Sequence, residues 1–229
     1  MNNKKQVAII TGGAKRVGKA ICQRLHKANI DLIIHYRNSK SEAIALQNQL
    51  NKIRKSSVSI IQADLLDPSS YALIINESIK IYGQLNFLIN NASTYYPTKI
   101  DNINEINWNE LIGSNLKASL FLSKEASPFL KKTNGSIINI TDAHITNPKK
   151  NYIIYSIAKS GLTTLTKSLA QELGPEIRVN AVAPGPVLWP EKSNEFNEKY
   201  QKKVISQTML KKVGAADDIA KAVEFLLLN

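Results

Sequence analysis

Two side chains in the middle of the chain have types and a spacing that suit proton transfer. Tyr155 and Lys159 stand four residues apart in a stretch with a helical pattern, so both lie on one face of the helix, one turn apart. An ammonium beside a phenol favours the phenolate, so we expect Lys159 to lower the pKa of Tyr155 and let it exchange a proton near neutral pH. This spacing alone is a weak signal, and a solvent-facing tyrosine beside an unrelated lysine is the alternative.

A carboxyl group is expected at the same place. Residues 137–140, Ile-Ile-Asn-Ile, form a short apolar run bounded by polar residues, which predicts a buried strand shortly before the helix. Asp142 follows this strand and can bring a third titratable group to Tyr155 and Lys159. The sequence therefore predicts a proton-transfer site at the meeting point of one strand end and one helix.

Strands and helices that alternate along the chain would position these groups. The expected strands are residues 6–10, 31–35, 58–62, 86–90, 137–140 and 178–183. The expected helices are residues 16–28, 41–55, 69–82, 108–131, a helix from about 152, and 216–228. This order predicts an α/β fold: a doubly wound, mostly parallel, Rossmann-like sheet with helices on both faces, in a single domain over residues 1–229. The charged segment 187–213 is expected to form a mobile lid over the substrate.

The first strand–helix junction, TGGAKRVG, has the composition of a phosphate-binding turn. Gly12 and Gly18 allow close approach and tight helix packing, so backbone N–H groups and the helix N-terminus can face a pyrophosphate. The other turn residues expected at a dinucleotide are Lys15, Arg16 and Val17. A glycine turn without a ligand is the alternative, because such turns are common connections.

The end of the second strand favours NADP(H) over NAD(H). An acidic residue there would hold the ribose 2′-hydroxyl, but the chain reads HYRNS, with no acid. Arg37 can pair with a 2′-phosphate and Ser39 can donate to it, with help from Lys15, while His35 and Tyr36 precede them at the same strand end. A surface arginine would explain Arg37 but not the missing acid.

Further candidate residues stand at the other strand ends, where ligands of such a sheet bind. Those expected at the cofactor are Asp64, Leu65, Asn91, Ala92, Ser93, Pro184 and Gly185. Asn115 lies within the expected helix 108–131, where asparagine is a poor helix former. Asn115 is either exposed or marks a local kink that is held by its side chain and lines the site.

Composition limits the other classes of function. The chain of 229 residues is 43% apolar and 21% charged, and it has no run near the roughly 18 apolar residues of a membrane helix. The short apolar run near the N-terminus is expected to be a strand rather than a signal peptide. Cys22 is the only cysteine, which excludes a disulfide framework and fits a reducing cytoplasm. We expect Cys22 to be a small core or near-surface residue rather than a nucleophile.

The charge of the chain suggests an anionic ligand. The net charge is +12, but the lysines are scattered, without a dense basic block or an aromatic platform. We therefore expect attraction of an anionic small molecule rather than nucleic-acid binding.

Taken together, these motifs resemble the short-chain dehydrogenase/reductase family over nearly the whole chain. The matching features are Thr11-Gly12 with Gly18, Asn90-Asn91-Ala92, Asn115, Tyr155 with Lys159, and Pro184-Gly185. The resemblance implies that Tyr155 is the proton donor, that Lys159 holds the nicotinamide ribose, and that Asn115 shapes a proton-relay water. It also implies a homotetramer. The family continues into a seventh strand, whereas this chain ends at Asn229, so either the sheet is one strand short or the C-terminus is absent from the given chain.

Three departures from the general family resemble its pteridine reductases, including bacterial dihydromonapterin reductases. Arg16 replaces a glycine, Asp142 replaces the catalytic serine, and Ser93 replaces the glycine of an Asn-Asn-Ala-Gly run. In that group the aromatic residue at the position of Tyr95 stacks on the pterin, the aspartate assists protonation, and the arginine contacts cofactor and pterin. The catalytic set is then Asp142, Tyr155, Lys159 and Asn115, and the substrate contacts are Arg16, Ser93, Tyr95, Asp142 and Tyr155.

The resemblance implies NADPH-dependent reduction of a dihydropterin or dihydrofolate to its tetrahydro form, by hydride transfer to a C=N bond. A flat pterin suits a stack between nicotinamide and an aromatic ring, and a carboxylate or serine can accept hydrogen bonds from its aminopyrimidine edge. One alternative is a ketone reductase such as a 3-oxoacyl-carrier-protein reductase, which Asp142 in place of serine disfavours. The other, a catalytically silent dinucleotide-binding regulator, is disfavoured by the intact Asn115–Tyr155–Lys159 set.

Overall fold

The strands are almost uniformly apolar, because helices cover both faces of the sheet that they form. The structure, a computed structural model, describes residues 5–189 and 197–229. Its strands are β1 (Val7–Ile10), β2 (Asp31–Tyr36), β3 (Val58–Gln62), β4 (Phe87–Asn90), β5 (Ser136–Ile140) and β6 (Arg178–Val182). They pair in parallel in the order β3-β2-β1-β4-β5-β6. Every residue of β1, β2, β4 and β5 is buried.

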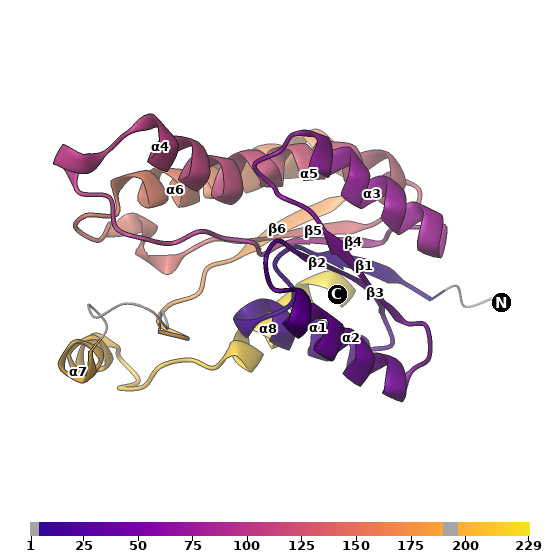
Figure 1. The fold of residues 1–229 in the computed structure, drawn as a ribbon, viewed down its shortest axis with the longest axis horizontal. Helices are drawn as coiled ribbons and strands as arrows, with labels where there is room; N and C mark the ends of the chain where they lie inside the picture. The colour runs from indigo at the N-terminus through magenta and orange to yellow at the C-terminus, as the bar shows by residue number, and fades with distance from the viewer. Residues whose placement is uncertain (1–4, 190–196) are drawn as a thin grey trace.

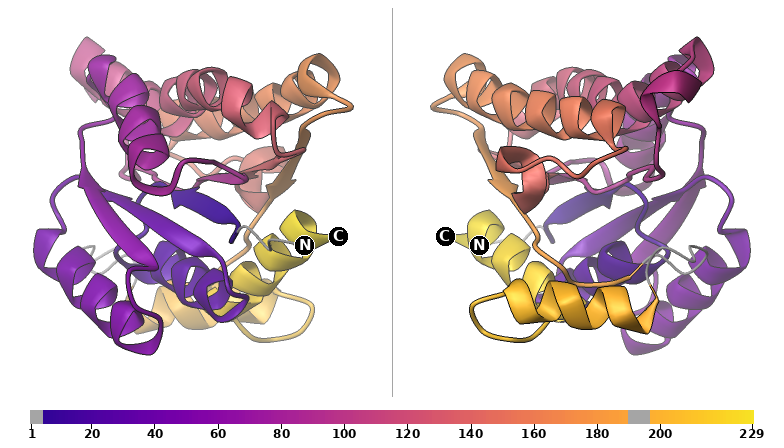
Figure 2. Two further views of the ribbon diagram at one scale, coloured as in Figure 1. Left: turned by 90° about the vertical axis from the view of Figure 1, so that its right-hand side faces the viewer. Right: turned by 90° about the vertical axis from the view of Figure 1, so that its left-hand side faces the viewer.

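Two layers of helices enclose this sheet (Figures 1 and 2). One face is covered by α1 (Arg16–Lys27), α2 (Lys40–Ile53) and α8 (Ala216–Leu228), and the other by α3 (Ser69–Tyr82), α5 (Ala118–Lys131) and α6 (Ile153–Leu173). Because side chains alternate along a strand, Ile10 packs into the core beneath α1, whereas Ile9 packs beneath α3 and α5. Cys22 is buried in the first of these cores, as expected of a structural cysteine.

The expected order of strands and helices is confirmed, as is the doubly wound parallel sheet. Element boundaries differ from the expected ones by about one or two residues, except along the expected helix 108–131. That helix is three segments: α4 (Glu105–Ile112), a π-helical segment (Gly113–Lys117), and α5. A wider π-turn leaves backbone carbonyl oxygens without their usual N–H donors. The Asn115 side chain donates a hydrogen bond to one of these oxygens, that of Leu111. The single uninterrupted helix was therefore wrong. A π-helical segment interrupts it at Asn115, whose side chain bonds to the Leu111 oxygen, in agreement with an irregularity held by this side chain.

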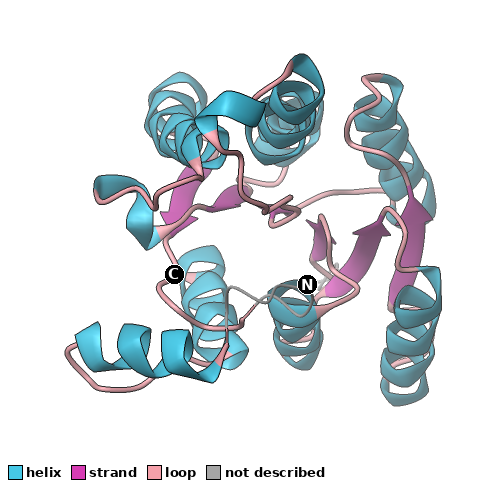
Figure 3. Ribbon diagram, turned by 60° about the vertical axis from the view of Figure 1, so that its left-hand side comes forward, coloured by secondary structure: helices cyan, strands magenta, loops and turns pink. Residues whose placement is uncertain are grey.

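The strand order reverses between β1 and β4, which leaves a crevice at the carboxyl ends of the strands. Figure 3 shows the loops that leave the strands here, between the two layers of helices. A short helix, α7 (Glu198–Gln207), lies beyond this end (Figure 1). Of the expected lid 187–213, residues 190–196 lie outside the described residues, and the described part includes α7.

Within the described residues, β6 forms an edge of the six-stranded sheet, without a seventh strand beside it. In the same part of the chain, no helix combines the length and apolar character needed to cross a membrane.

Candidate active site

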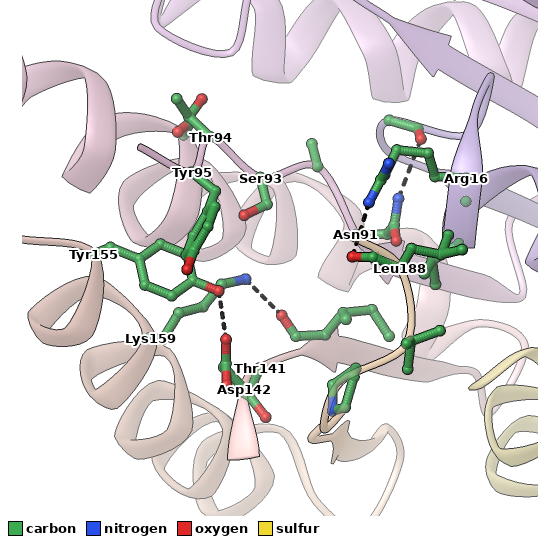
Figure 4. A pocket seen from close by; sticks show the side chains of 18 of the residues that line it. Arg16, Asn91, Ser93, Thr94, Tyr95, Thr141, Asp142, Tyr155, Lys159 and Leu188 are labelled. Atoms are coloured by element: carbon green, nitrogen blue, oxygen red, sulfur yellow. Dashed lines mark hydrogen bonds between the residues drawn. The ribbon is translucent and has the colours of Figure 1, made fainter. Parts of the chain in front are cut away.

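A cavity of about 820 Å³ opens at the carboxyl ends of the strands. Its walls come from the glycine turn, the ends of β2 to β5, the N-terminal half of α6, and α7. Tyr155, Lys159 and Asp142 lie together in this cavity (Figure 4). The sequence-based expectation that these three groups meet therefore agrees with the geometry.

Asp142 links the end of β5 to α6. The Tyr155 hydroxyl donates to Asp142 Oδ2 at 2.7 Å (Figure 4). Asp142 Oδ1 accepts from the backbone N–H of His144 at 2.8 Å and lies 3.0 Å from His144 Nδ1. Asp142 is thus the N-cap of a short 3-10 turn (Ala143–Thr146), and this cap holds its carboxylate toward Tyr155.

Hydrogen bonds keep Asp142 ionised. Burial acts to raise the pKa of Asp142, but the bonds from the side chain and backbone of His144 and from Tyr155 together hold it below its ordinary value. Asp142 is therefore a carboxylate near neutral pH in the ligand-free site.

The same carboxylate reverses the expected direction of the Tyr155 pKa. Burial raises the pKa of Tyr155 well above its ordinary value, and the charge and hydrogen bond of Asp142 raise it further. The expectation that Lys159 would lower this pKa was wrong for the ligand-free site. The Tyr155 hydroxyl therefore remains protonated in the ligand-free site.

Lys159 is a buried cation, with 3% of its surface exposed. Its Nζ donates to the backbone oxygen of Ile140 at 2.8 Å and lies 5.9 Å from the centre of the Tyr155 ring (Figure 4). Burial lowers the pKa of Lys159 to about 8, although the charge of Asp142 opposes this shift. The ammonium is therefore poised to titrate at mildly alkaline pH.

Asn115 lies behind the cavity wall, buried in the π-helical segment. Its amide nitrogen donates to the backbone oxygens of Leu111 and Thr94, at 2.8 and 2.9 Å. Its amide oxygen accepts from the Ser93 hydroxyl at 2.6 Å. The expectation that Asn115 lines the site was wrong. Ser93 lines the cavity, and Asn115 is linked to the cavity through its hydrogen bond with Ser93.

The glycine turn forms a close cradle for a phosphate. A Cβ added at Gly12, whose φ is +60°, would stand 3.0 Å from the Ala92 Cα, and one at Gly18 would collide with the Gly12 oxygen. Asn91 closes the cradle from β4, because its side chain donates to the backbone oxygens of Thr11 and Gly12 at 2.9 and 3.1 Å. Backbone can therefore approach a ligand here without obstruction, which fits a dinucleotide pyrophosphate.

Arg16 occupies an unusual backbone position in the same turn. Its φ of 54° lies in the left-handed region that favours glycine. Its guanidinium donates to the backbone oxygen of Leu188 at 3.1 Å (Figure 4). It also donates to the backbone oxygen of Trp189 at 3.1 Å. Arg16 therefore ties the glycine turn to the start of the segment expected to form a lid.

The end of β2 presents basic groups, but each already has a partner. Arg37 Nε lies 3.0 Å from Asp64 Oδ2, and Lys15 Nζ lies 2.5 Å from a carboxylate oxygen of Glu42. Both pairs are partly exposed, so an incoming phosphate can compete for either cation. Arg37, Ser39 and Lys15 line the cavity, which agrees with the expected phosphate contact.

His35 differs from the expected direct cofactor contact. Its Nδ1 accepts from the Gly12 N–H at 3.2 Å, and its Nε2 donates to the Ala63 oxygen at 3.1 Å. Burial lowers the pKa of His35 to about 4, so the ring is neutral. With both ring nitrogens engaged within the protein, His35 positions the glycine turn rather than offering a nitrogen to a ligand.

An aromatic wall closes the substrate side of the cavity. Tyr95 stacks on Tyr152 with ring centres 4.6 Å apart, and meets Tyr155 edge-on at 4.8 Å. Lys149 Nζ lies 4.4 Å from the centre of the Tyr152 ring and 5.1 Å from that of Tyr200 on α7. This wall places a flat, electron-rich surface beside Asp142 and Tyr155.

Nearly all of the expected site residues line this cavity. The expected residues found there are Gly12, Lys15, Arg16, Val17, Gly18, His35, Tyr36, Arg37, Ser39, Asp64, Leu65, Asn91, Ala92, Ser93, Tyr95, Asp142, Tyr155, Lys159, Pro184 and Gly185. Sequence reasoning missed His144, Tyr152 and Lys149. The signal for His144 was its place two residues after Asp142, whereas the other two depend on tertiary packing.

Comparison with known proteins agrees with this site. The family model described as short chain dehydrogenase matches residues 6–201. Pteridine reductase 1 of Leishmania tarentolae is 29% identical, over 96% of this chain and 89% of that protein. The 3-oxoacyl-(acyl-carrier-protein) reductase of Staphylococcus aureus (strain Mu50) is 30% identical, over the same shares of each chain.

The match to the family model spans most of the chain and includes the glycine turn, Asp142, Tyr155 and Lys159. The names of the two relatives imply different substrates at nearly equal identity, so the relatives agree on the family and not on the substrate. The chain belongs to the short-chain dehydrogenase family of oxidoreductases, whose members use NAD(P)(H).

Proposed function

We propose that this enzyme reduces pteridines, taking a dihydropterin or dihydrofolate to its tetrahydro form with NADPH. The observation that carries the proposal is the 2.7 Å hydrogen bond from the Tyr155 hydroxyl to the Asp142 carboxylate. The general family resemblance places a serine where Asp142 stands, and a serine hydroxyl can donate to a carbonyl oxygen. An ionised carboxylate can only accept, so the position suits a substrate edge rich in N–H donors.

The chemistry asks two things of the protein. A bound nicotinamide cofactor supplies hydride to the carbon of the C=N bond. The protein must supply a proton to the nitrogen, and Tyr155 with Asp142 is the acid pair beside the cavity. Because Asp142 is ionised in the ligand-free site, the transferable proton lies on Tyr155, and their shared hydrogen bond makes the two groups titrate as a unit.

The aromatic wall supports a flat substrate. Tyr95 is held in place from one side by Tyr152, at 4.6 Å, and 38% of its surface is exposed. A preformed aromatic surface reduces the entropy lost when a bicyclic ring stacks against it. Ser93 is also part of the cavity lining and can accept a hydrogen bond from the amino edge of a pterin.

The preference for NADPH is proposed from the end of β2. Arg37 and Lys15 are the cations at the place where a 2′-phosphate would lie, and β2 ends in Tyr36 without an acid. Asp64 at the end of β3 pairs with Arg37, which offsets part of this preference until the phosphate displaces it.

A ketone reductase is the second candidate, because the 3-oxoacyl-(acyl-carrier-protein) reductase of Staphylococcus aureus is 30% identical to this chain. The two candidates are separated by turnover of NADPH with purified enzyme on dihydrobiopterin, dihydrofolate and an acetoacetyl thioester. If the enzyme is a pteridine reductase, its kcat/KM for a dihydropterin should exceed its kcat/KM for the thioester. A thioester reduced efficiently beside an inert dihydropterin would overturn it in favour of the ketone reductase.

A further inference from the structure

His144 connects the acid pair of the site to solvent. Its Nδ1 lies 3.0 Å from Asp142 Oδ1, and the opposite oxygen of Asp142 accepts from Tyr155 at 2.7 Å. The His144 side chain is 58% exposed, compared with 20% for Asp142. The three groups therefore form a continuous hydrogen-bonded line from the surface to the centre of the cavity.

We propose that His144 is the proton-entry group of this site: it takes protons from solvent and passes them to Asp142, which restores the proton of Tyr155. This inference rests on the proposed role of Asp142 and Tyr155 as the acid pair. It does not depend on whether the substrate is a pterin or a ketone, because either reduction consumes one proton.

The proton balance of one turnover defines what His144 must do. A hydride forms a new C–H bond, and a proton from Tyr155 forms the new N–H bond while NADPH is oxidised. Tyr155 is then a phenolate and takes a proton through the Asp142 carboxyl group. The proton that Asp142 passes on leaves Nδ1 of the His144 imidazolium, and the neutral imidazole recovers a proton from water.

The charges around His144 favour its protonated form. The hydrogen bond that the His144 ring donates to the Asp142 carboxylate raises the pKa of His144 above its ordinary value, against partial burial and the positive charge of Lys149 in the loop before α6. From α6, Tyr155 and the buried ammonium of Lys159 face the other side of Asp142. His144 thus contacts Asp142 with a largely exposed side chain, whereas Lys159 is buried.

A purely structural role for His144 can be separated from proton supply. The cap of the 3-10 turn uses the backbone N–H of His144, at 2.8 Å from Asp142 Oδ1, and any residue retains it. His144→Asn keeps a side-chain donor near Asp142 but cannot titrate. His144→Ala removes both the side-chain donor and the titratable group, and it leaves space for free imidazole. Thr146→Ala, in the same exposed turn, is the matched control.

The first test measures kcat against pH for these variants with NADPH and a dihydropterin. We expect His144→Asn and His144→Ala to lose about 10²-fold in kcat, the lower end for a positioned acid–base group, with little change in KM. The wild-type decline that follows His144 should disappear in both, whereas a decline due to Lys159, near pH 8, should remain. Added imidazole should restore activity to His144→Ala only. A wild-type pH profile and kcat in His144→Asn would overturn the proposal.

The second test does not depend on any substrate. The His144 ring is titrated by NMR in the ligand-free wild type and in Asp142→Asn. We expect its pKa to fall in the variant, because the carboxylate that stabilises the imidazolium is gone. An unchanged His144 pKa would contradict the proposed pair. If the wild type reduces the thioester and not the dihydropterin, the proposed function fails, and the same pH series on the thioester still decides the role of His144.

Discussion

Lys159 shows how a single buried charge can serve a site at the expense of stability. Its Nζ has one backbone acceptor, the oxygen of Ile140, and its pKa is lowered from 10.5 to about 8 by burial. A lysine with a depressed pKa binds fewer protons in the folded than in the unfolded protein between these two values. The free energy of unfolding must therefore rise with pH across this window as far as Lys159 is concerned.

The corresponding prediction compares wild type with Lys159→Met by urea unfolding on either side of this window. The difference in unfolding free energy should move in favour of wild type as pH rises from about 8 to 10.5, by at most about 1.4 kcal/mol per pH unit. The other titrating groups cancel in the difference. A difference that does not change with pH would mean that Lys159 is not desolvated in solution.

Arg37 is the residue on which the proposed NADPH preference depends. A charge-assisted phosphate contact contributes about 1.5–3 kcal/mol, so Arg37→Ala should weaken NADPH binding by roughly ten- to a hundred-fold. NADH binding should change little and serves as the internal control. Equal affinity of the wild-type enzyme for the two cofactors, measured by fluorescence titration, would contradict the preference itself.

Among the structural elements, the glycine turn before α1 holds an arginine, Arg16, at a position where the backbone conformation favours glycine. Arg16 adopts a φ of 54°, and its guanidinium donates hydrogen bonds to the backbone oxygens of Leu188 and Trp189. The backbone strain of this residue and the tether to the 187–189 segment are therefore two separable effects of one side chain.

Arg16→Gly and Arg16→Ala separate them. Both lose the tether and should weaken NADPH binding to the same degree. The glycine variant should be more stable than the alanine variant by about 1 kcal/mol, because a left-handed conformation is unfavourable for a residue with a Cβ. Urea unfolding midpoints measure this directly, and equal midpoints would show that the left-handed turn does not persist in solution.

The order of elements was accessible from sequence because each strand is a short apolar run with a turn signal after it. The π-helical segment was only partly accessible. A poor helix former at Asn115 indicated a kink, but its form depends on the bonds to Leu111, Thr94 and Ser93, which come from two different parts of the chain. The predicted direction of the Tyr155 pKa shift was wrong for a similar reason. That shift depends on the position of Asp142 rather than on the spacing of Tyr155 and Lys159 in the sequence.

For the whole molecule, the net charge of +12 bears on how an anionic cofactor is captured. A positive protein field raises the local concentration of anions, and salt screens it over about 8–10 Å at physiological ionic strength. NADPH has a phosphate group that NADH lacks, so it should feel this field more strongly.

The KM for NADPH should therefore rise more steeply with ionic strength than the KM for NADH. Steady-state kinetics over a salt series measures both slopes, with a neutral osmolyte at matched concentration as the control. Parallel slopes would show that the charge excess lies too far from the cavity to influence cofactor binding.

We propose that Asp142 makes this site a pteridine reductase, at a position where the resemblance to the general family implies a serine. The measurement to make is the ratio of kcat/KM for a dihydropterin to that for an acetoacetyl thioester, in wild type and in Asp142→Ser. We expect the variant to lose about 10²–10⁴-fold on dihydropterin, as for a lost acid–base group, with NADPH binding retained and a slight gain on the thioester. An Asp142→Ser enzyme that reduces dihydropterin as fast as wild type would contradict it.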